Sequence, residues 1–263
     1  MALDNEGFSP GTIDGRIGPR MIQAMNVSPD VGRTTCLRMN AGWWQTWKVP
    51  ADFSKDVAPL PEGWTARSKL KALTYETVRE KVAERFHVSE DFLQFLNPTV
   101  RDWSRLREND TLKVPALSPR RLPRADHLSV RLSDKVIVAL DADNHPLASF
   151  PCSIAAKKEK RPVGKLEVRV LASDPEYLFD PKLFEESAEA KTIKSKLMIP
   201  PGPNNPVGAM WIGLDRPGYG IHGSPWPEDI GKTESHGCFR LSNWDAKRLA
   251  GMLKIGTPVW IEN

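Results

Sequence analysis

One cysteine and two histidines are the residues of this chain whose types and spacing are best suited to chemistry. Cys238 lies in the segment 235–240, which reads SHGCFR, and no second cysteine lies nearby. A thiol becomes a useful nucleophile at neutral pH only when a neighbouring group takes its proton or lowers its pKa. His236 falls on the same side as Cys238 if the segment is extended, and His222 is far enough away in sequence to approach from a neighbouring strand. The pattern therefore favours a Cys–His acyl-transfer site.

Three other interpretations of these residues remain open. A lone cysteine can be a buried structural thiol, because free cysteine is among the most buried residue types. His222, His236 and Cys238 could bind zinc, although no Cys-x-x-Cys or His-x-x-x-His pair supplies a further ligand. Ser235 could be the nucleophile, but no Gly-x-Ser-x-Gly turn surrounds it.

The flanking residues favour catalysis over these alternatives. Gly223 and Gly237 have no side chain, so each permits a ligand to approach the backbone closely. Arg240 places a fixed cation two residues from the thiol. We therefore expect a cysteine-dependent site with a nearby binding group for an anion.

The same segments resemble the catalytic domain of the YkuD-type L,D-transpeptidases. The resemblance covers roughly residues 126–263 and depends on several residue types at fixed offsets: YGIHGS at 219–224, IGK at 230–232 and SHGCFRLSN at 235–243, with shorter matches at 200–208 and 256–259.

The resemblance implies a role for each residue of the predicted site. Cys238 is the expected nucleophile, and His222 is the expected base. The N–H groups of Gly237 and Cys238 are candidates for an oxyanion hole, and the turn around them is expected to be shaped by Ser235 and His236. The residues expected to contact substrate are Arg240, Asn243, Gly223 and Tyr219. Neither a cofactor nor a metal is implied.

The activity that the resemblance implies is cross-linking of peptidoglycan stem peptides through a cysteine thioester. The partners are then stem peptides and glycan, with a lipoprotein lysine as a possible acceptor. Water as acceptor would give an L,D-carboxypeptidase, and lipoprotein attachment would give a wall-anchoring transpeptidase. A non-catalytic wall-binding protein is a further alternative, whereas a papain-like protease would need a Gly-x-Cys-Trp type of segment that the chain lacks.

Hydrophobic patterning predicts that the second half of the chain is mainly β, with a β-sandwich-like fold. Strands are expected at 128–132, 136–140, 166–171 and 259–261, and a helix at 242–253 with a capping-box-like start. An insertion at 174–200, with a helix over 185–196, precedes the catalytic strands and could cap the active site.

The sequence pattern of the first half of the chain predicts two small modules. Residues 7–25 resemble the middle of a helical peptidoglycan-binding module, followed by a connector rich in tryptophan: Trp43, Trp44, Trp47 and Trp64. We expect these indoles to fill core or to cover a neighbouring domain, with sugar stacking as the alternative. Residues 66–117 resemble a LysM domain of βααβ order, with Ser89 as an N-cap, although residues 75–77 lack its usual Gly-Asp-Thr turn. Glycan binding and a spacer role are both open for this domain.

These patterns predict an α+β, multidomain chain. We place a partial peptidoglycan-binding-like segment and connector at 1–65, the LysM-like domain at 66–117, an exposed linker at 118–125 and the catalytic domain at 126–263, which we expect to fold on its own.

The formal charge of +4 does not demand a nucleic-acid partner, and no apolar run approaches the ~18 residues of a membrane span. We expect no bridge between Cys36 and Cys152. A wall enzyme acts in the periplasm or elsewhere outside the cytoplasm, yet an export signal is not evident, so we expect an N-terminal truncation or a misassigned start.

Overall fold

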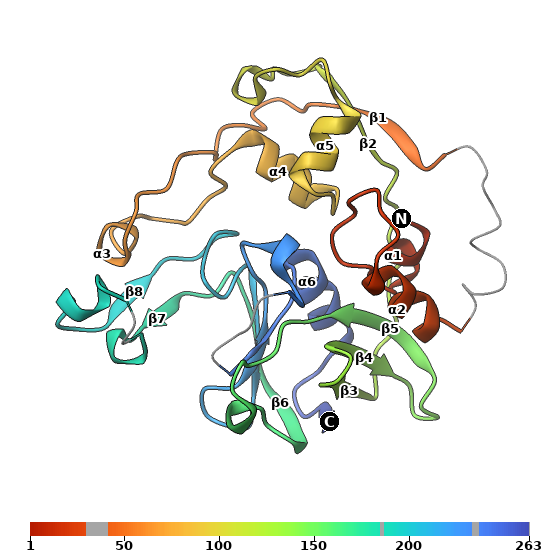
Figure 1. The fold of residues 1–263 in the computed structure, drawn as a ribbon, viewed down its shortest axis with the longest axis vertical. Helices are drawn as coiled ribbons and strands as arrows, with labels where there is room; N and C mark the ends of the chain where they lie inside the picture. Colours follow the sequence, from red (N-terminus) through yellow and green to blue (C-terminus); the bar gives the residue numbers. More distant parts are fainter. Residues whose placement is uncertain (30–41, 185–186, 233–236, 263) are drawn as a thin grey trace.

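The second half of the chain folds into one mixed, eight-stranded sheet (Figure 1). In this computed structural model, residues 1–29, 42–184, 187–232 and 237–262 are described. The strand order is β11-β10-β9-β6-β12-β3-β4-β5. The bounds are β3 His127–Arg131, β4 Val136–Leu140, β5 Pro146–Pro151, β6 Gly164–Ser173, β9 Met210–Leu214, β10 Gly220–His222, β11 Phe239–Arg240 and β12 Pro258–Glu262. The predicted strands at 128–132, 136–140, 166–171 and 259–261 are confirmed, each within a few residues.

The sheet curls around its longest strand, β6, which joins the strands β12-β3-β4-β5 on one side to β9-β10-β11 on the other. The first part of β6 pairs with β12, and the second part pairs with β9 after a shift of register near Val168. The far edges also meet: the backbone of Ser153, just beyond β5, exchanges two hydrogen bonds with that of Arg240 in β11, at 2.9 and 3.0 Å. A single strongly curled sheet thus gives the sandwich-like form that the sequence predicts.

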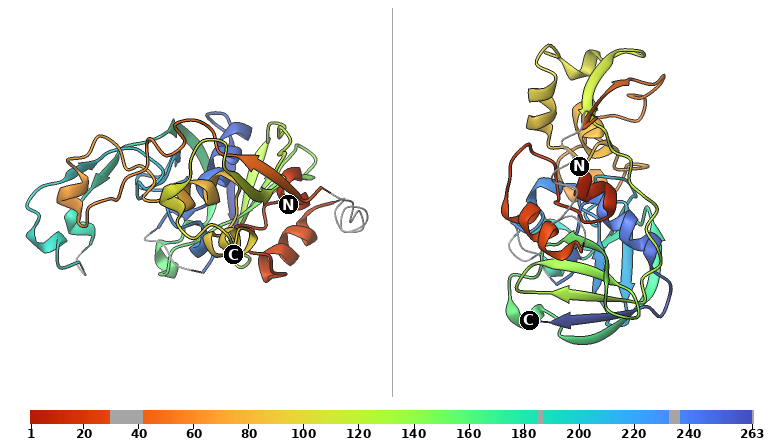
Figure 2. Two further views of the ribbon diagram at one scale, coloured as in Figure 1. Left: turned by 90° about the horizontal axis from the view of Figure 1, so that it is seen from above. Right: turned by 90° about the vertical axis from the view of Figure 1, so that its right-hand side faces the viewer.

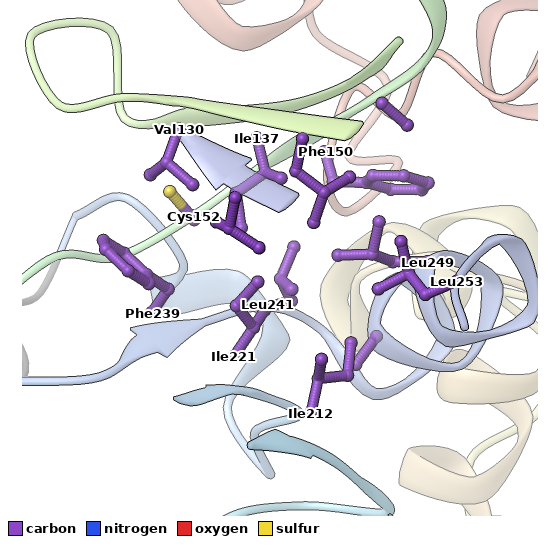
Figure 3. Packing of buried hydrophobic residues seen from close by; sticks show 14 of the residues in the cluster. Val130, Ile137, Phe150, Cys152, Ile212, Ile221, Phe239, Leu241, Leu249 and Leu253 are labelled. Atoms are coloured by element: carbon purple, nitrogen blue, oxygen red, sulfur yellow. The ribbon is translucent and has the colours of Figure 1, made fainter. Parts of the chain in front are cut away.

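The main core lies inside this curl (Figure 3). Residues from both halves of the sheet, such as Ile137 and Ile212, are fully buried there, and helix α6 (Asn243–Met252) adds Leu249. The hydroxyl of Ser242 accepts a hydrogen bond from the Asp245 backbone N–H and so caps α6, which confirms the predicted helix start.

A βααβ unit lies on the other side of α6 (Figures 1 and 2). Its helices are α4 (Val78–Arg85) and α5 (Glu90–Leu96), and its strands β1 (Trp44–Lys48) and β2 (Thr111–Pro115) pair antiparallel. Ser89 caps α5 by accepting from the Phe92 N–H, as predicted, and Asn97 ends the helix. The helices and the second strand are where the sequence places them.

The first strand of this unit lies outside the predicted boundary of 66–117. Strand β1 belongs to the segment that we assigned to the connector. A long excursion between β1 and α4, which carries the short helix α3 (Trp64–Arg67), separates the strand from its helices. Periodicity could not reveal the pairing of segments so far apart.

The tryptophans of the connector pack against other aromatic rings. Trp47 lies 5.2 Å from Phe86 between ring centroids, and Trp64 lies 4.3 Å from Phe179. The predicted role of these indoles in filling core and covering a neighbouring domain accounts for both contacts.

The N-terminal segment packs on the curled sheet. It contains α1 (Ala2–Glu6) and α2 (Pro19–Val27), and the Ser9 N–H donates to the Ser149 carbonyl in β5 at 2.8 Å. The proposed linker 118–125 is mostly exposed but does not hang free, because the Arg120 N–H donates to the Asn5 carbonyl at 3.0 Å. The two halves of the chain therefore share interfaces, which the expectation of an independent catalytic domain did not anticipate.

The insertion at 174–200 forms a hairpin rather than the predicted helix. Strands β7 (Tyr177–Phe179) and β8 (Leu197–Ile199) pair antiparallel. Within 185–196, residues 185 and 186 lie outside the described residues, and the remainder contains one short 3-10 turn, Ala190–Thr192. The charged side chains here lack the apolar spacing that would bury one face of a helix.

None of the helices in the described part of the chain is long and apolar enough to span a membrane. Cys152 and Cys238 form no disulfide with each other, and Cys36 lies outside the described residues.

Candidate active site

Two short parallel strands position the predicted catalytic residues. In the β10–β11 pair, Ile221 is the partner of Phe239 and His222 is the partner of Arg240. Ile221 and Phe239 are buried in the main core. Because successive side chains of a strand point to opposite faces, His222 and Arg240 point away from that core. Cys238 immediately precedes β11, so the same alternation predicts its side chain on the face that carries Arg240.

His222 is held in one orientation and one tautomer. Its Nδ1 lies 2.7 Å from the Gly223 carbonyl oxygen, which can only accept, so Nδ1 carries the proton and Nε2 keeps its lone pair. The ring stacks on Trp211, its partner in β9, with centroids 5.7 Å apart. Burial lowers the pKa of His222 to about 4, against the raising effect of the Gly223 hydrogen bond. The imidazole is therefore neutral at pH 7 and able to accept a proton.

The Cys238 thiol is also neutral at rest. It is half-buried, and its Sγ donates to the Gly218 carbonyl oxygen at 3.4 Å. Burial raises the pKa of Cys238, and the backbone N–H of Gly220 opposes that rise. A neutral thiol beside a neutral imidazole needs proton removal during attack, in contrast to a preformed thiolate–imidazolium pair.

Gly223, which follows His222, packs closely against the side chain of Asn243. A Cβ at Gly223 would lie 2.3 Å from Oδ1 of Asn243, and one at Gly208 would lie 2.1 Å from the same atom. Asn243 is fully buried: its Oδ1 accepts from the Ala209 N–H at 2.9 Å, and its Nδ2 donates to Glu84 at 3.0 Å. Substrate contact by Gly223 and Asn243 stays a prediction, whereas their evident contribution is to fix the loop that follows His222.

The other predicted substrate residues lie near the thiol. Arg240 is half-buried; burial lowers the pKa of its guanidinium, and the carboxylate of Asp229 opposes that shift. A Cβ at Gly237 would lie 3.7 Å from the ring of Tyr219, which places these two residues side by side. Ser235 and His236 lie outside the described residues.

Two aromatic residues near the site were not predicted from the sequence. Trp211 stacks on His222, and Tyr177 lies on the hairpin 174–200, where burial, and next the charge of Cys238, raise the pKa of its phenol. The position of the insertion suggested a cap over the site, but no local pattern singles out Tyr177. The contact of Trp211 depends on strand pairing, which the sequence does not specify.

Comparisons with known proteins find relatives of this chain. A Bacillus subtilis protein that carries the name L,D-transpeptidase YkuD is 26% identical over 194 residues, which span 72% of this chain and 98% of that protein. Its Bacillus licheniformis namesake is 46% identical over 61 residues, but these span only 37% of that relative. The structure of L,D-transpeptidase 3 from Mycobacterium tuberculosis aligns over 60% of this chain and 76% of that protein's chain, at 16% identity and a TM-score of 0.40, which is too low to carry an argument.

The family model of the YkuD L,D-transpeptidase catalytic domain matches residues 125–261. Since this match covers more than half of the chain, the protein belongs to the YkuD family of L,D-transpeptidases.

Proposed function

We propose that this protein cross-links peptidoglycan stem peptides through a thioester on Cys238. The observation that carries the proposal is the β10–β11 pair, where a neutral histidine with a free Nε2 lone pair is the strand partner of Arg240 and the half-buried Cys238 immediately precedes the second strand. This set suits acyl transfer by a nucleophile and a general base.

The reaction begins with transfer of the thiol proton to Nε2 of His222 as Sγ bonds to the donor carbonyl carbon. The carbonyl oxygen takes up the electron pair, and the N–H groups of Gly237 and Cys238 are the proposed donors to that oxyanion. When the C–N bond breaks, His222 returns the proton to the leaving amine, and a thioester remains. An acceptor amine then attacks the thioester, loses a proton to His222, and releases Cys238 as a thiol.

Arg240 is the proposed contact for an anionic group of the stem peptide. A guanidinium can present two parallel donors to a carboxylate, which an ammonium cannot. Partial burial strengthens such a contact by weakening the competition from water.

Covalent labelling tests the nucleophile. Incubation with a carbapenem should add one acyl mass to the wild-type protein and to Cys152→Ala, which removes a fully buried core thiol. Cys238→Ala should show no adduct and no cross-linked product from defined muropeptides. Retained turnover by Cys238→Ala would exclude the thioester mechanism.

The pH dependence of acylation tests the role of His222. Because the pKa of His222 is about 4 and that of Cys238 is raised, general-base catalysis predicts a rate that is nearly flat through neutral pH and falls below about pH 4. His222→Ala should slow acylation by ~10²–10⁴-fold at pH 7 and leave a rate that rises about tenfold per pH unit. An unchanged profile in His222→Ala would assign the base to another residue.

Muropeptide products identify the acceptor. A dimer indicates an amine of a second stem, and a shortened monomer indicates water. A protein with this activity must meet its substrate outside the cytoplasm, so we propose an extracytoplasmic site of action. Wall binding by the LysM-like unit and by the N-terminal segment belongs to the same proposal, and sedimentation with purified sacculi measures it.

A further inference from the structure

A hairpin at residues 174–200, here called the flap, begins beside the proposed catalytic row. One row of paired positions crosses the sheet from Ala172 in β6 through Trp211 and His222 to Arg240. The chain leaves β6 one residue later, and Asp174 turns it sharply with a φ of 46°. The flap is therefore attached beside Trp211, the residue on which the His222 ring stacks.

The first strand of the flap begins with a tyrosine, Tyr177. Burial is the main cause that raises the pKa of Tyr177 to about 12, and the charge of Cys238 is the next. The phenol is consequently protonated at neutral pH and can donate a hydrogen bond. A half-buried ring with a donor at its tip suits an amphipathic ligand such as a peptide.

The flap has little support of its own. Its two strands are three residues long each, and a two-stranded hairpin is marginally stable in water at best. Leu178 and Met198 on its strands are exposed. Its position must therefore come from contacts with another part of the chain.

Those contacts come from the excursion between β1 and α4, of which residues 58–74 are here called the strut. Trp64 of the strut stacks on Phe179 with centroids 4.3 Å apart and planes at 17°. The same indole lies 6.0 Å from Phe184 and 6.5 Å from Tyr177. Figures 1 and 2 show α3 alongside β7 and β8 at the end of the molecule farthest from the N-terminal helices.

The strut is fixed to the catalytic domain at its far end. The Leu73 N–H donates to the Pro201 carbonyl at 2.7 Å, and the Asn204 N–H donates to the Leu73 carbonyl at 3.1 Å. Gly202 is required there, since a Cβ would lie 2.1 Å from the Leu73 oxygen. Leu73 and Ile199 at the base of the flap are both fully buried. The strut thus spans from the βααβ unit to the catalytic domain and holds the flap between.

We propose that the strut sets the position of the flap over Cys238, with Trp64 as a positioning residue and Tyr177 as the side chain that contacts the acyl donor. The proposal rests on the proposed function, because the donor is the stem peptide of that reaction. It assigns to the first half of the chain a part in the catalytic step, in addition to any wall binding. The competing explanation is that Trp64 covers apolar surface and has no effect on substrate.

Hydrogen exchange tests the mechanical part without any assumption about activity. In Trp64→Ala, the amides of β7 and β8 should exchange about tenfold faster, while those of β3 and β4 stay unchanged. Trp64→Phe, which keeps an aromatic ring, should restore most of the protection. Trp260→Ala removes an equally large, partly exposed indole from the distant strand β12 and is the matched control.

Kinetics test the functional part. With a stem-peptide donor, Trp64→Ala should raise KM about fivefold or more and leave the rate of Cys238 alkylation by a small neutral reagent within about twofold, because only the peptide needs the flap. Tyr177→Phe should show a similar rise in KM. If Trp64 acts through Tyr177, the double variant should be no worse than Tyr177→Phe alone.

Each result decides the question. Unchanged exchange of the flap in Trp64→Ala overturns the strut. Faster exchange with unchanged KM, or fully additive effects with Tyr177→Phe, leaves Trp64 as a structural residue and overturns the positioning role. Trp64→Ala could also speed exchange of the β1 and β2 amides, which would indicate a wider loss of structure. In that case Trp64→Phe decides: the proposal is overturned if this variant does not restore both the slow exchange of the flap amides and the wild-type KM. Absence of turnover in the wild-type protein would reject the proposed function, while the exchange data would still judge the strut.

Discussion

Two of the places where the first half of the chain contacts the catalytic half differ in chemistry. At the polar junction, Asp4 of α1 lies 3.0 Å from His87 of the βααβ unit and 3.4 Å from Arg248 of α6. At the aromatic junction, Trp64 and Leu73 of the strut pack on the flap without a buried ion pair among the described residues. One junction holds a rigid helix, and the other supports a hairpin beside the thiol.

The polar contacts of one junction and the aromatic contacts of the other suit the elements they hold, which are helix α1 and the flap. Hydrogen bonds and ion pairs depend steeply on distance and angle, so the polar junction specifies one orientation of three segments. Its stack of His87 on Trp244, with planes at 9°, adds to that order. Stacked rings keep most of their contact area when they slide, so the aromatic junction can support a flap that adjusts to a substrate.

The largest expected effect comes from breaking the polar junction at Asp4. This carboxylate is fully buried, and Asp4→Ala leaves Arg248 without its closest partner. We expect a loss of about 4 kcal/mol in the free energy of unfolding, as found when one partner of a buried pair is removed. Urea unfolding measures it, with Asp134→Ala at an exposed position as the control. A loss below about 1 kcal/mol would show that the junction adds little to stability.

The aromatic junction should show a comparable but smaller loss at Leu73. The side chain is fully buried, so Leu73→Ala should cost about 3 kcal/mol through lost burial and a residual cavity. Unlike the loss at Asp4, this loss should be the same at pH 5 and pH 8, because no charge is removed. A loss that changes between these pH values would contradict the apolar character of the junction.

The sequence predicted the inside of each domain better than the contacts between domains. Alternating apolar residues were enough to place the strands of the sheet, and the resemblance of the segments around Cys238 predicts His222, Cys238 and Arg240 as one site, of which the pairing of His222 with Arg240 is observed. Neither Asp4 nor Trp64 carries such a signal, because their partners His87 and Phe179 lie far away in sequence. The helix expected over 185–196 failed for a local reason: the charged side chains there lack the apolar spacing that would bury one face of a helix.

The pH dependence of the polar junction separates the two junctions further. Burial, with the charge of Asp4 next, raises the pKa of Asp245 from 3.8 to about 6. The folded protein then binds this proton more tightly than the unfolded chain, so the stabilisation is complete below about pH 4 and is lost as the pH rises through 6.

Asp245→Asn should therefore remove a pH-dependent cost. We expect the variant to gain about 3 kcal/mol over the wild type at pH 7 and less than about 1 kcal/mol at pH 4. His222, whose pKa is lowered to about 4, contributes with the opposite sign, so the difference between variant and wild type is the quantity to measure. A difference that does not vary between pH 4 and 7 would show that Asp245 titrates normally.

The smallest expected effect tests whether the aromatic junction depends on a polar contact between the flap and the strut helix α3. The Thr65 N–H donates to Oε1 of Glu189 at 3.3 Å, at an exposed position. Because water can replace the carboxylate there, Glu189→Ala should lower the free energy of unfolding by about 0.5 kcal/mol or less. It should also leave exchange of the β7 and β8 amides unchanged, in contrast to Trp64→Ala. If Glu189→Ala loosens the flap as much as Trp64→Ala does, hydrogen bonding rather than ring stacking holds the flap, and the distinction between the two junctions is lost.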